Sequence, residues 1–186
     1  MDRHTPTAGL LTLAAALFVF LPSVVTAEEP IVSLTERIGM LEEQDQEPLV
    51  QVFASGRLLV HRPSHWKNPG DFETQLSNTE LDELLVELLD LDMAGVDEAK
   101  IAAAKTAARA AGGANVRIYV SDPNEIIIDL NVPGVAGRAA VNRQIRHNGV
   151  RGDAMKFPGI SEIQSLAAAT DRLRALTSES GLRAVK

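Results

Sequence analysis

The residues best suited to chemistry in this chain of 186 residues are two histidines with the spacing His-x-x-x-His, His61 and His65. On a helix this spacing would place both imidazoles on one face, where they can bind zinc. Pro63 lies between them and the residues before it favour a strand, so we do not expect a helix here. Asp71 can join them from the next loop. The sequence thus offers a metal site of His61, His65 and Asp71 as one hypothesis, with structural or solvated histidines as the favoured one.

The same loop contains the only tryptophan of the chain, Trp66, between His65 and Lys67. An aromatic side chain among polar loop residues can anchor a partner or stack on a sugar. It can equally fold back and cover the end of a sheet, and this second interpretation is the favoured one. We keep Trp66, His65 and Lys67 as the candidate binding residues.

Other catalytic patterns are missing from the sequence. There is no Gly-x-Ser-x-Gly motif around a serine, no glycine-rich phosphate loop between a strand and a helix, and no cysteine for thiol chemistry. His147 is expected in a polar loop, 147–159, without a recognisable partner. The triplet Arg151-Gly152-Asp153 matches the integrin-binding tripeptide, a match that arises easily by chance. We therefore predict no catalytic residue and no cofactor, and regard an enzyme as the less favoured class.

The first 27 residues have the layout of a secretory signal peptide. An apolar run, Ala8–Leu21, is followed by Pro22 and by small residues up to Ala27. The run is shorter than the about 20 apolar residues that cross a bilayer, so an uncleaved anchor is the less favoured alternative. Because a lipoprotein anchor needs a cysteine, that anchor is excluded. We expect an exported bacterial protein, periplasmic or extracellular, cleaved after Ala27 and without stable membrane insertion afterwards.

The net charge of −7 argues against nucleic acid as a partner, because binding the phosphate backbone needs clustered lysine and arginine. One basic stretch stands out: Arg138, Arg143, Arg146, His147 and Arg151. Solvated charges on a strand and loop are the favoured interpretation, and a patch for an anionic ligand is the alternative. The expected partner is an envelope protein or another ligand.

The elements that must position these residues follow from periodicity and turn signals. A capping box, Ser77-Asn78-Thr79-Glu80, predicts a helix with leucines on one face. A second box, Ser161–Gln164, predicts another, and an alanine-rich helix at 98–111 is expected to lie on the surface. Strands are predicted at 31–34, 49–53, 58–61, 72–76, 116–121, 126–132 and 139–145.

Together these elements predict one α+β domain, residues 28–180, with a mainly antiparallel sheet of hairpins and about three helices packed on one face. The hairpins join 49–53 to 58–61 and 116–121 to 126–132. Residues 181–186 are expected to be a frayed tail.

The stretch 51–63 has an aromatic residue, a glycine turn and an Arg-Pro end, and is followed by Gly-Asp-Phe-Glu at 70–73. With the Leu-Ser-x-x-Glu-Leu helix start at 76–81, it resembles a group of uncharacterised secreted bacterial proteins. Ala54-Ser55-Gly56 stands where a Gly-Asp-Gly turn is more usual in that group. The resemblance implies the hairpin–helix layout and an envelope location, and it implies no activity.

Overall fold

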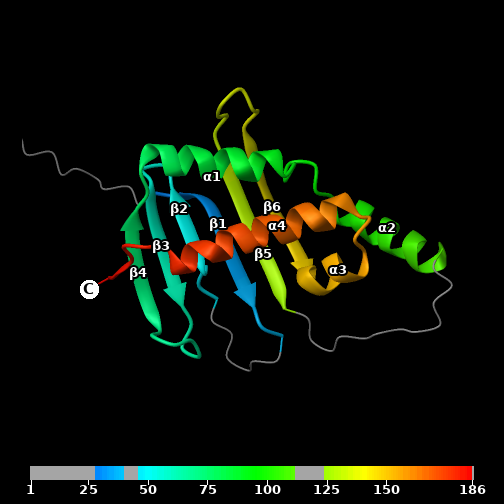
Figure 1. Ribbon diagram of the computed structural model, residues 1–186, viewed down its shortest axis with the longest axis horizontal. Helices are drawn as coiled ribbons and strands as arrows, with labels where there is room; N and C mark the ends of the chain where they lie inside the picture. Colours follow the sequence, from blue (N-terminus) through cyan, green and yellow to red (C-terminus); the bar gives the residue numbers. More distant parts are fainter. Residues whose placement is uncertain (1–27, 40–45, 112–123, 186) are drawn as a thin grey trace, which may run out of the picture.

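The computed structural model describes residues 28–39, 46–111 and 124–185 (Figure 1). The expected signal peptide, 1–27, and the predicted strand 116–121 lie outside these residues. In the part of the chain that is described, no helix is both long enough and apolar enough to span a membrane.

In the described ranges seven strands form one antiparallel sheet, in the order β6-β5-β1-β2-β3-β4-β7 (Figure 1). Their bounds are β1 Pro30–Arg37, β2 Val50–Phe53, β3 Arg57–Arg62, β4 Gly70–Gln75, β5 Glu125–Val132, β6 Val141–Asn148 and β7 Arg183–Ala184. This confirms the predicted α+β class with a mainly antiparallel sheet.

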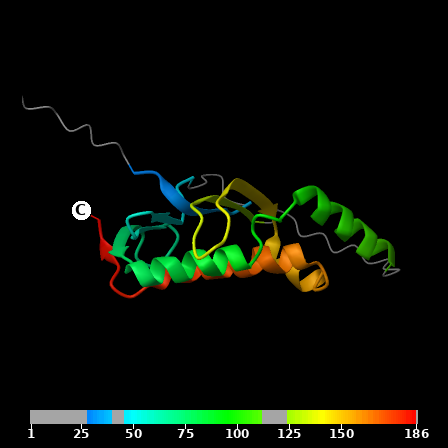
Figure 2. The ribbon, with the colours of Figure 1, turned by 90° about the horizontal axis from the view of Figure 1, so that it is seen from above.

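Among the described residues there are four α-helices, one more than the approximate prediction. They are α1 Asn78–Asp90, α2 Glu98–Ala111, α3 Val150–Lys156 and α4 Ser161–Ala175, and a 3-10 turn, η1 Leu176–Ser178, continues α4. Helices α1 and α4 lie side by side across one face of the sheet (Figures 1 and 2). Helix α2 projects beyond the β6 end of the sheet, and only Ile101 of it is buried.

The core lies between the sheet and these two helices. Arg174 of α4 bonds Glu36 of β1, so the even-numbered residues of β1 face the helices. Val32 and Leu34 are fully buried there. They join one cluster with the apolar faces of α1 and α4, which comprise Leu81, Leu84, Leu85, Leu88, Ile163, Leu166 and Leu173.

The opposite side of the sheet is called the helix-free face here, because no described helix lies over it (Figure 2). Strand alternation and the registers assign its residues. They include Ser33, Thr35 and Arg37 of β1, Glu125, Ile127 and Asp129 of β5, Asn142, Gln144, Arg146 and Asn148 of β6, His61 of β3, and Asp71, Glu73 and Gln75 of β4.

Only the first predicted capping box forms. At α1 the Glu80 N–H donates to Ser77 Oγ at 3.3 Å, and the Ser77 N–H donates to Glu80 Oε2 at 2.7 Å. At α4 the N-cap is Ile160, without a side-chain cap bond. Gln164 instead donates to the carbonyl oxygen of Ala154 at 3.0 Å, because α3 packs beside the start of α4. The second box was therefore a wrong prediction.

In the described residues β5 pairs with β1 on one side and with β6, the strand that follows it, on the other. The predicted hairpin partner, 116–121, lies outside the described residues. One further prediction needs correction. Residues 181–186 were expected to fray, but Arg183–Ala184 pair with β4 as β7, and the Val185 N–H donates to the Asp71 carbonyl at 2.9 Å. A strand of two residues is too short to leave a periodic pattern in the sequence.

Candidate functional site

The predicted residues His61 and Asp71 meet on the helix-free face. They are opposite each other on β3 and β4, with His61 Nδ1 and Asp71 Oδ1 2.6 Å apart. The Asp71 side chain is 67% exposed and that of His61 22%. His65 is exposed in the loop after β3, and the described residues contain no group of three or more histidines and carboxylates that could hold a metal ion. The structure thus joins two of the three residues of the metal hypothesis.

The Trp66 side chain is half-buried and packs against the hydrophobic core. The backbone N–H of Trp66 donates to the Pro63 carbonyl at 2.9 Å, which closes a turn after β3. The flanking His65 and Lys67 are exposed. Because the aromatic ring already has apolar neighbours within the chain, Trp66 offers a partner only part of its surface.

Polar side chains bond to one another across the middle of the helix-free face. Asp129 of β5 accepts from Ser33 Oγ at 3.2 Å and from Gln144 Nε2 at 2.7 Å, and Arg146 donates to Gln144 Oε1 at 2.9 Å. Arg37 pairs with Glu125 at 3.1 Å, yet its Nε is buried and has no hydrogen-bond partner within the described chain. The centre of this face is therefore largely satisfied internally.

The two margins of the helix-free face are more open and differ in charge. At the β6 margin Asn142, Gln144, Arg146 and Asn148 are all exposed, and at the β4 margin Asp71, Glu73 and Gln75 are exposed. In the centre of the face, between the two margins, Thr35 and Ile127 are both buried. The β6 margin thus presents three amides and one basic group, Arg146, and the β4 margin two carboxylates and one amide, an arrangement that can orient a polar partner.

A second His–Asp pair was missed by the sequence analysis. The Asp153 carboxylate lies 2.9 Å from His147 Nε2 and 2.5 Å from Lys105 Nζ, all through Oδ2. The side chains of His147 and Asp153 are 9% and 13% exposed and that of Lys105 20%. Lys105 and Arg109 also lie over the Phe157 ring. This cluster connects β6, α3 and α2. A carboxylate that accepts from donors on two other elements is suited to holding those elements together.

The sequence analysis missed this cluster because it expected residues 147–159 to form a loop. In the structure β6 continues to Asn148 and α3 begins at Val150, after Gly149 in a left-handed conformation with φ of 69°. That short turn brings Asp153 back beside His147. The one sequence signal was a glycine between a strand-like and a helix-compatible run. Asp153 also belongs to the Arg-Gly-Asp triplet, whose carboxylate is thus engaged inside the chain.

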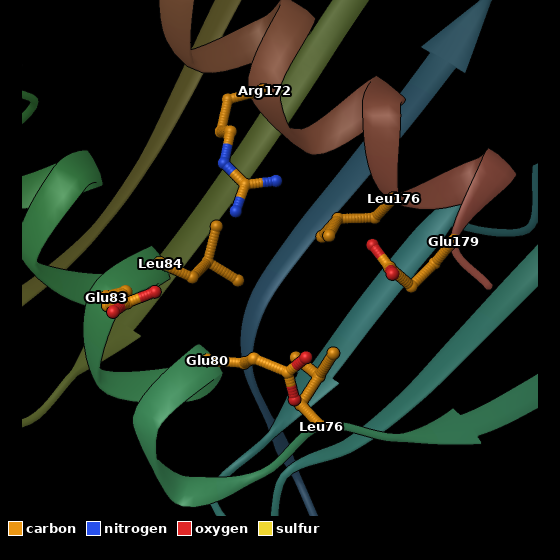
Figure 3. A pocket seen from close by; sticks show the side chains of 7 residues that line it. All are labelled: Leu76, Glu80, Glu83, Leu84, Arg172, Leu176 and Glu179. Carbon is orange, nitrogen blue, oxygen red and sulfur yellow. The ribbon is translucent and has the colours of Figure 1, made fainter. Parts of the chain in front are cut away.

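A shallow groove of about 170 Å³ lies between α1 and η1 (Figure 3). Its floor is formed by Leu76, Leu84 and Leu176, which are themselves buried, and its rim by Glu80, Glu83, Glu179 and Arg172. Hydrogen bonds from the side chain and backbone of Ser77 lower the pKa of Glu80. Arg172 donates to Glu87 at 2.6 Å. The three carboxylates of the rim favour a cationic ligand. The leucines of the floor are buried, so such a ligand would find little apolar surface to contact.

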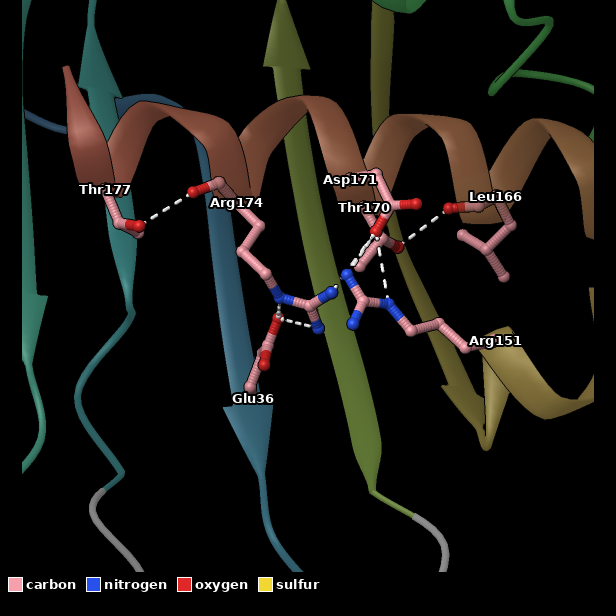
Figure 4. Close-up of polar contacts among 7 residues, drawn as sticks. All are labelled: Glu36, Arg151, Leu166, Thr170, Asp171, Arg174 and Thr177. Carbon is pink, nitrogen blue, oxygen red and sulfur yellow. Dashed lines mark hydrogen bonds and ion pairs between the residues drawn. The ribbon is translucent and has the colours of Figure 1, made fainter. Parts of the chain in front are cut away.

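The basic stretch is occupied by contacts within the chain. Arg138 makes two bonds of 2.7 Å to Asp90, and Arg143 donates to the Ala94 carbonyl at 2.5 Å. Arg151 bonds Asp171 at 2.7 Å, beside the Arg174–Glu36 pair that joins α4 to β1 (Figure 4). Arg138, Arg143 and Arg151 are therefore engaged in contacts within the chain. This does not favour the alternative in which the basic stretch binds an anionic ligand.

Comparison of the chain with protein-family models, with curated proteins and with solved structures returned no match.

Proposed function

We propose that the chain is a non-enzymatic binding domain of the bacterial cell envelope that docks a partner protein against the helix-free face. The observation that carries this proposal is the division of the sheet. Helices α1 and α4 bury one face, whereas the other presents exposed polar margins on β6 and β4. The polar character fits a reversible interaction, since permanent interfaces are more apolar.

The two margins give this surface a direction. A partner with acidic groups toward β6 and basic groups toward β4 would dock in one orientation, because opposite charges face each other only that way. Among the described residues the exposed large apolar side chains are only Met155 and Val185. Met155 belongs to α3, and Val185 lies beside the β4 margin, opposite Asp71 when the β4–β7 register is continued. Charge and hydrogen bonding, rather than apolar contact, are thus the expected source of specificity.

The test is a matched pair of charge reversals. Arg146→Glu changes the β6 margin, and Lys100→Glu makes the same change of charge on exposed α2. We expect Arg146→Glu to lower the affinity for the partner isolated from envelope extracts by about tenfold or more, and Lys100→Glu to leave it unchanged. Equal affinities for the two variants, with unchanged melting temperatures, would remove the helix-free face as the docking surface.

Export, with cleavage after Ala27, is part of the proposal. The first residue after the expected cleavage site, Glu28, accepts hydrogen bonds from the Ser55 N–H and Oγ–H, both at 2.9 Å. A chain that begins at Glu28 therefore keeps this contact with the β2–β3 turn. Intact-mass measurement on protein recovered from the envelope is expected to give a chain starting at Glu28. A mass that includes residues 1–27 would contradict cleavage after Ala27.

The second candidate function is a hydrolase or metal-dependent enzyme using His61, His65 and Asp71. The contact of 2.6 Å between His61 and Asp71 favours it, because a carboxylate beside an imidazole orients the ring for metal binding. Zinc added to the purified protein would then raise the melting temperature, and His61→Ala would abolish that rise. No bound zinc and no thermal shift would exclude the metal version.

A further inference from the structure

The two edges of the sheet are covered very differently. An uncovered edge strand presents unpaired N–H and C=O groups to other chains. At the β6 edge, Glu98 of α2 accepts from the Arg146 N–H at 3.0 Å, so a helix of 14 residues lies beside it. At the opposite edge β4 is covered by β7, which has only two residues, both exposed. The β4 edge is therefore the less protected of the two.

Few contacts hold β7 in place. The pairs are Phe72 with Ala184 and Glu73 with Arg183, and the Val185 N–H donates to the Asp71 carbonyl at 2.9 Å. Leu182 packs partly against the core just before the strand. In contrast, the six residues of β4 pair with β3 along their whole length. Loss of β7 would thus leave β4 in the sheet with its outer backbone groups open.

The side chains of β4 indicate what this edge would accept. Asp71 and Glu73 are exposed carboxylates two positions apart, and directly opposite residues in an antiparallel pair interact through their side chains. Arg183 of β7 lies opposite Glu73. Continuing the same register places Val185, whose side chain is 45% exposed, opposite Asp71. The C-terminal strand β7 therefore places a basic residue opposite Glu73, whereas Asp71 faces an apolar residue.

From these observations we propose that the outer edge of β4 is a strand-addition site. An extended segment of a partner protein, with two basic residues separated by one residue, displaces β7 and pairs antiparallel with β4. Backbone hydrogen bonds supply the affinity in this mode of recognition, and the alternate side chains supply the specificity. The proposal rests on the proposed binding function and names the kind of partner segment.

The experiment uses the labelled peptide Thr-Arg-Val-Arg-Val-Thr and its counterpart with Glu in place of both Arg, measured by fluorescence anisotropy. Val185→Pro removes the N–H that donates to Asp71 and so weakens β7. Ala184→Pro is the matched control, because alternate residues of a strand direct their N–H groups to opposite sides. We expect Val185→Pro to bind the Arg peptide about five- to tenfold more tightly than the wild type does, the effect of losing one competing hydrogen bond. Ala184→Pro should bind like the wild type.

Equal affinity of the wild type and Val185→Pro for the Arg peptide, or equal affinity of Val185→Pro for the Arg and Glu peptides, would overturn the proposal. A chain ended after Leu182 gives the same test without a proline, and circular dichroism checks that each variant is folded. Glu73→Lys should abolish the preference for the Arg peptide. If the peptide results fail while Arg146→Glu still weakens partner binding, the edge proposal is wrong and the proposed function stands.

Discussion

Two His–Asp pairs in this molecule differ in setting although their chemistry is similar. His61 and Asp71 meet across two strands, and the carboxylate is 67% exposed. His147 and Asp153 meet at the junction of a strand and a helix, 9% and 13% exposed, and Lys105 shares the same carboxylate oxygen. Water competes for the first pair and is largely excluded from the second. We infer that burial, rather than the residue types, decides how much such a pair stabilises the fold.

The largest expected effect is at the buried pair. Asp153→Ala leaves His147 and Lys105 without their shared acceptor in a mostly buried position. We expect it to lower the free energy of unfolding by about 2–4 kcal/mol, measured by urea denaturation. Asp153→Asn keeps an acceptor oxygen and should cost less. A loss for Asp153→Ala no larger than that for Asp71→Ala would break the comparison.

Lys105→Met tests the contribution of Lys105, which shares the Asp153 carboxylate with His147, and its expected effect is smaller than that of Asp153→Ala. The substitution keeps an unbranched apolar stem but removes the ammonium group and with it the ion pair to Asp153, for an expected loss of about 1–2 kcal/mol. Because only Ile101 of α2 is buried, local opening should increase most in this helix. Hydrogen exchange of the α2 amides should therefore become faster while that of α4 stays the same. Uniform acceleration across both helices would contradict a local role.

Asp71→Ala is expected to change the free energy of unfolding by less than about 1 kcal/mol, because solvent screens the exposed pair with His61. The same urea measurement checks it. A loss comparable to that of Asp153→Ala would show that the exposed pair also stabilises the fold.

The smallest effect concerns a third carboxylate, Glu80, which is fully exposed at the start of α1 and belongs to neither pair. Hydrogen bonds from Ser77 lower its pKa below the usual 4.5. A lowered pKa in the folded state stabilises the protein above pH 4.5, and this contribution disappears as the pH falls through the folded pKa. Thermal melts between pH 6 and pH 2 should show this loss for the wild type and a weaker one for Ser77→Ala. Identical pH profiles would contradict the capping contact.

The contrast between the pairs also explains which features were predictable. The helix after Ser77 followed from a local signal, a capping box before a leucine stripe. His61 ends a strand that was recognised, whereas Asp71 was expected in the loop before the strand 72–76 and lies within β4. His147 and Asp153 come together only because a short helix, α3, forms where a loop was expected. The box at Ser161 failed because Ile160 is the N-cap and Ser161 is already the first helical residue, and Gln164 donates to a carbonyl of α3 instead. Local patterns thus predicted local structure, whereas contacts made by packing between elements did not appear in them.

The tail shows the same limit. Arg183 and Ala184 have no periodicity of their own, and β7 exists because β4 presents an open edge at the right place. The charge division across the helix-free face likewise depends on strand order, since β6 and β4 are far apart in the sequence and at opposite sides of the sheet. Only the topology makes these margins parts of one surface.

Carboxyl footprinting tests the central claim, docking against the helix-free face, most directly. Carbodiimide labelling of the protein with and without its partner compares Asp71 and Glu73 on that face with Asp82 and Glu83 on the outer side of α1, all four being exposed in the free chain. The account predicts that the partner lowers labelling of Asp71 and Glu73 and leaves Asp82 and Glu83 unchanged. Protection of Asp82 and Glu83 with Asp71 and Glu73 still labelled would contradict it.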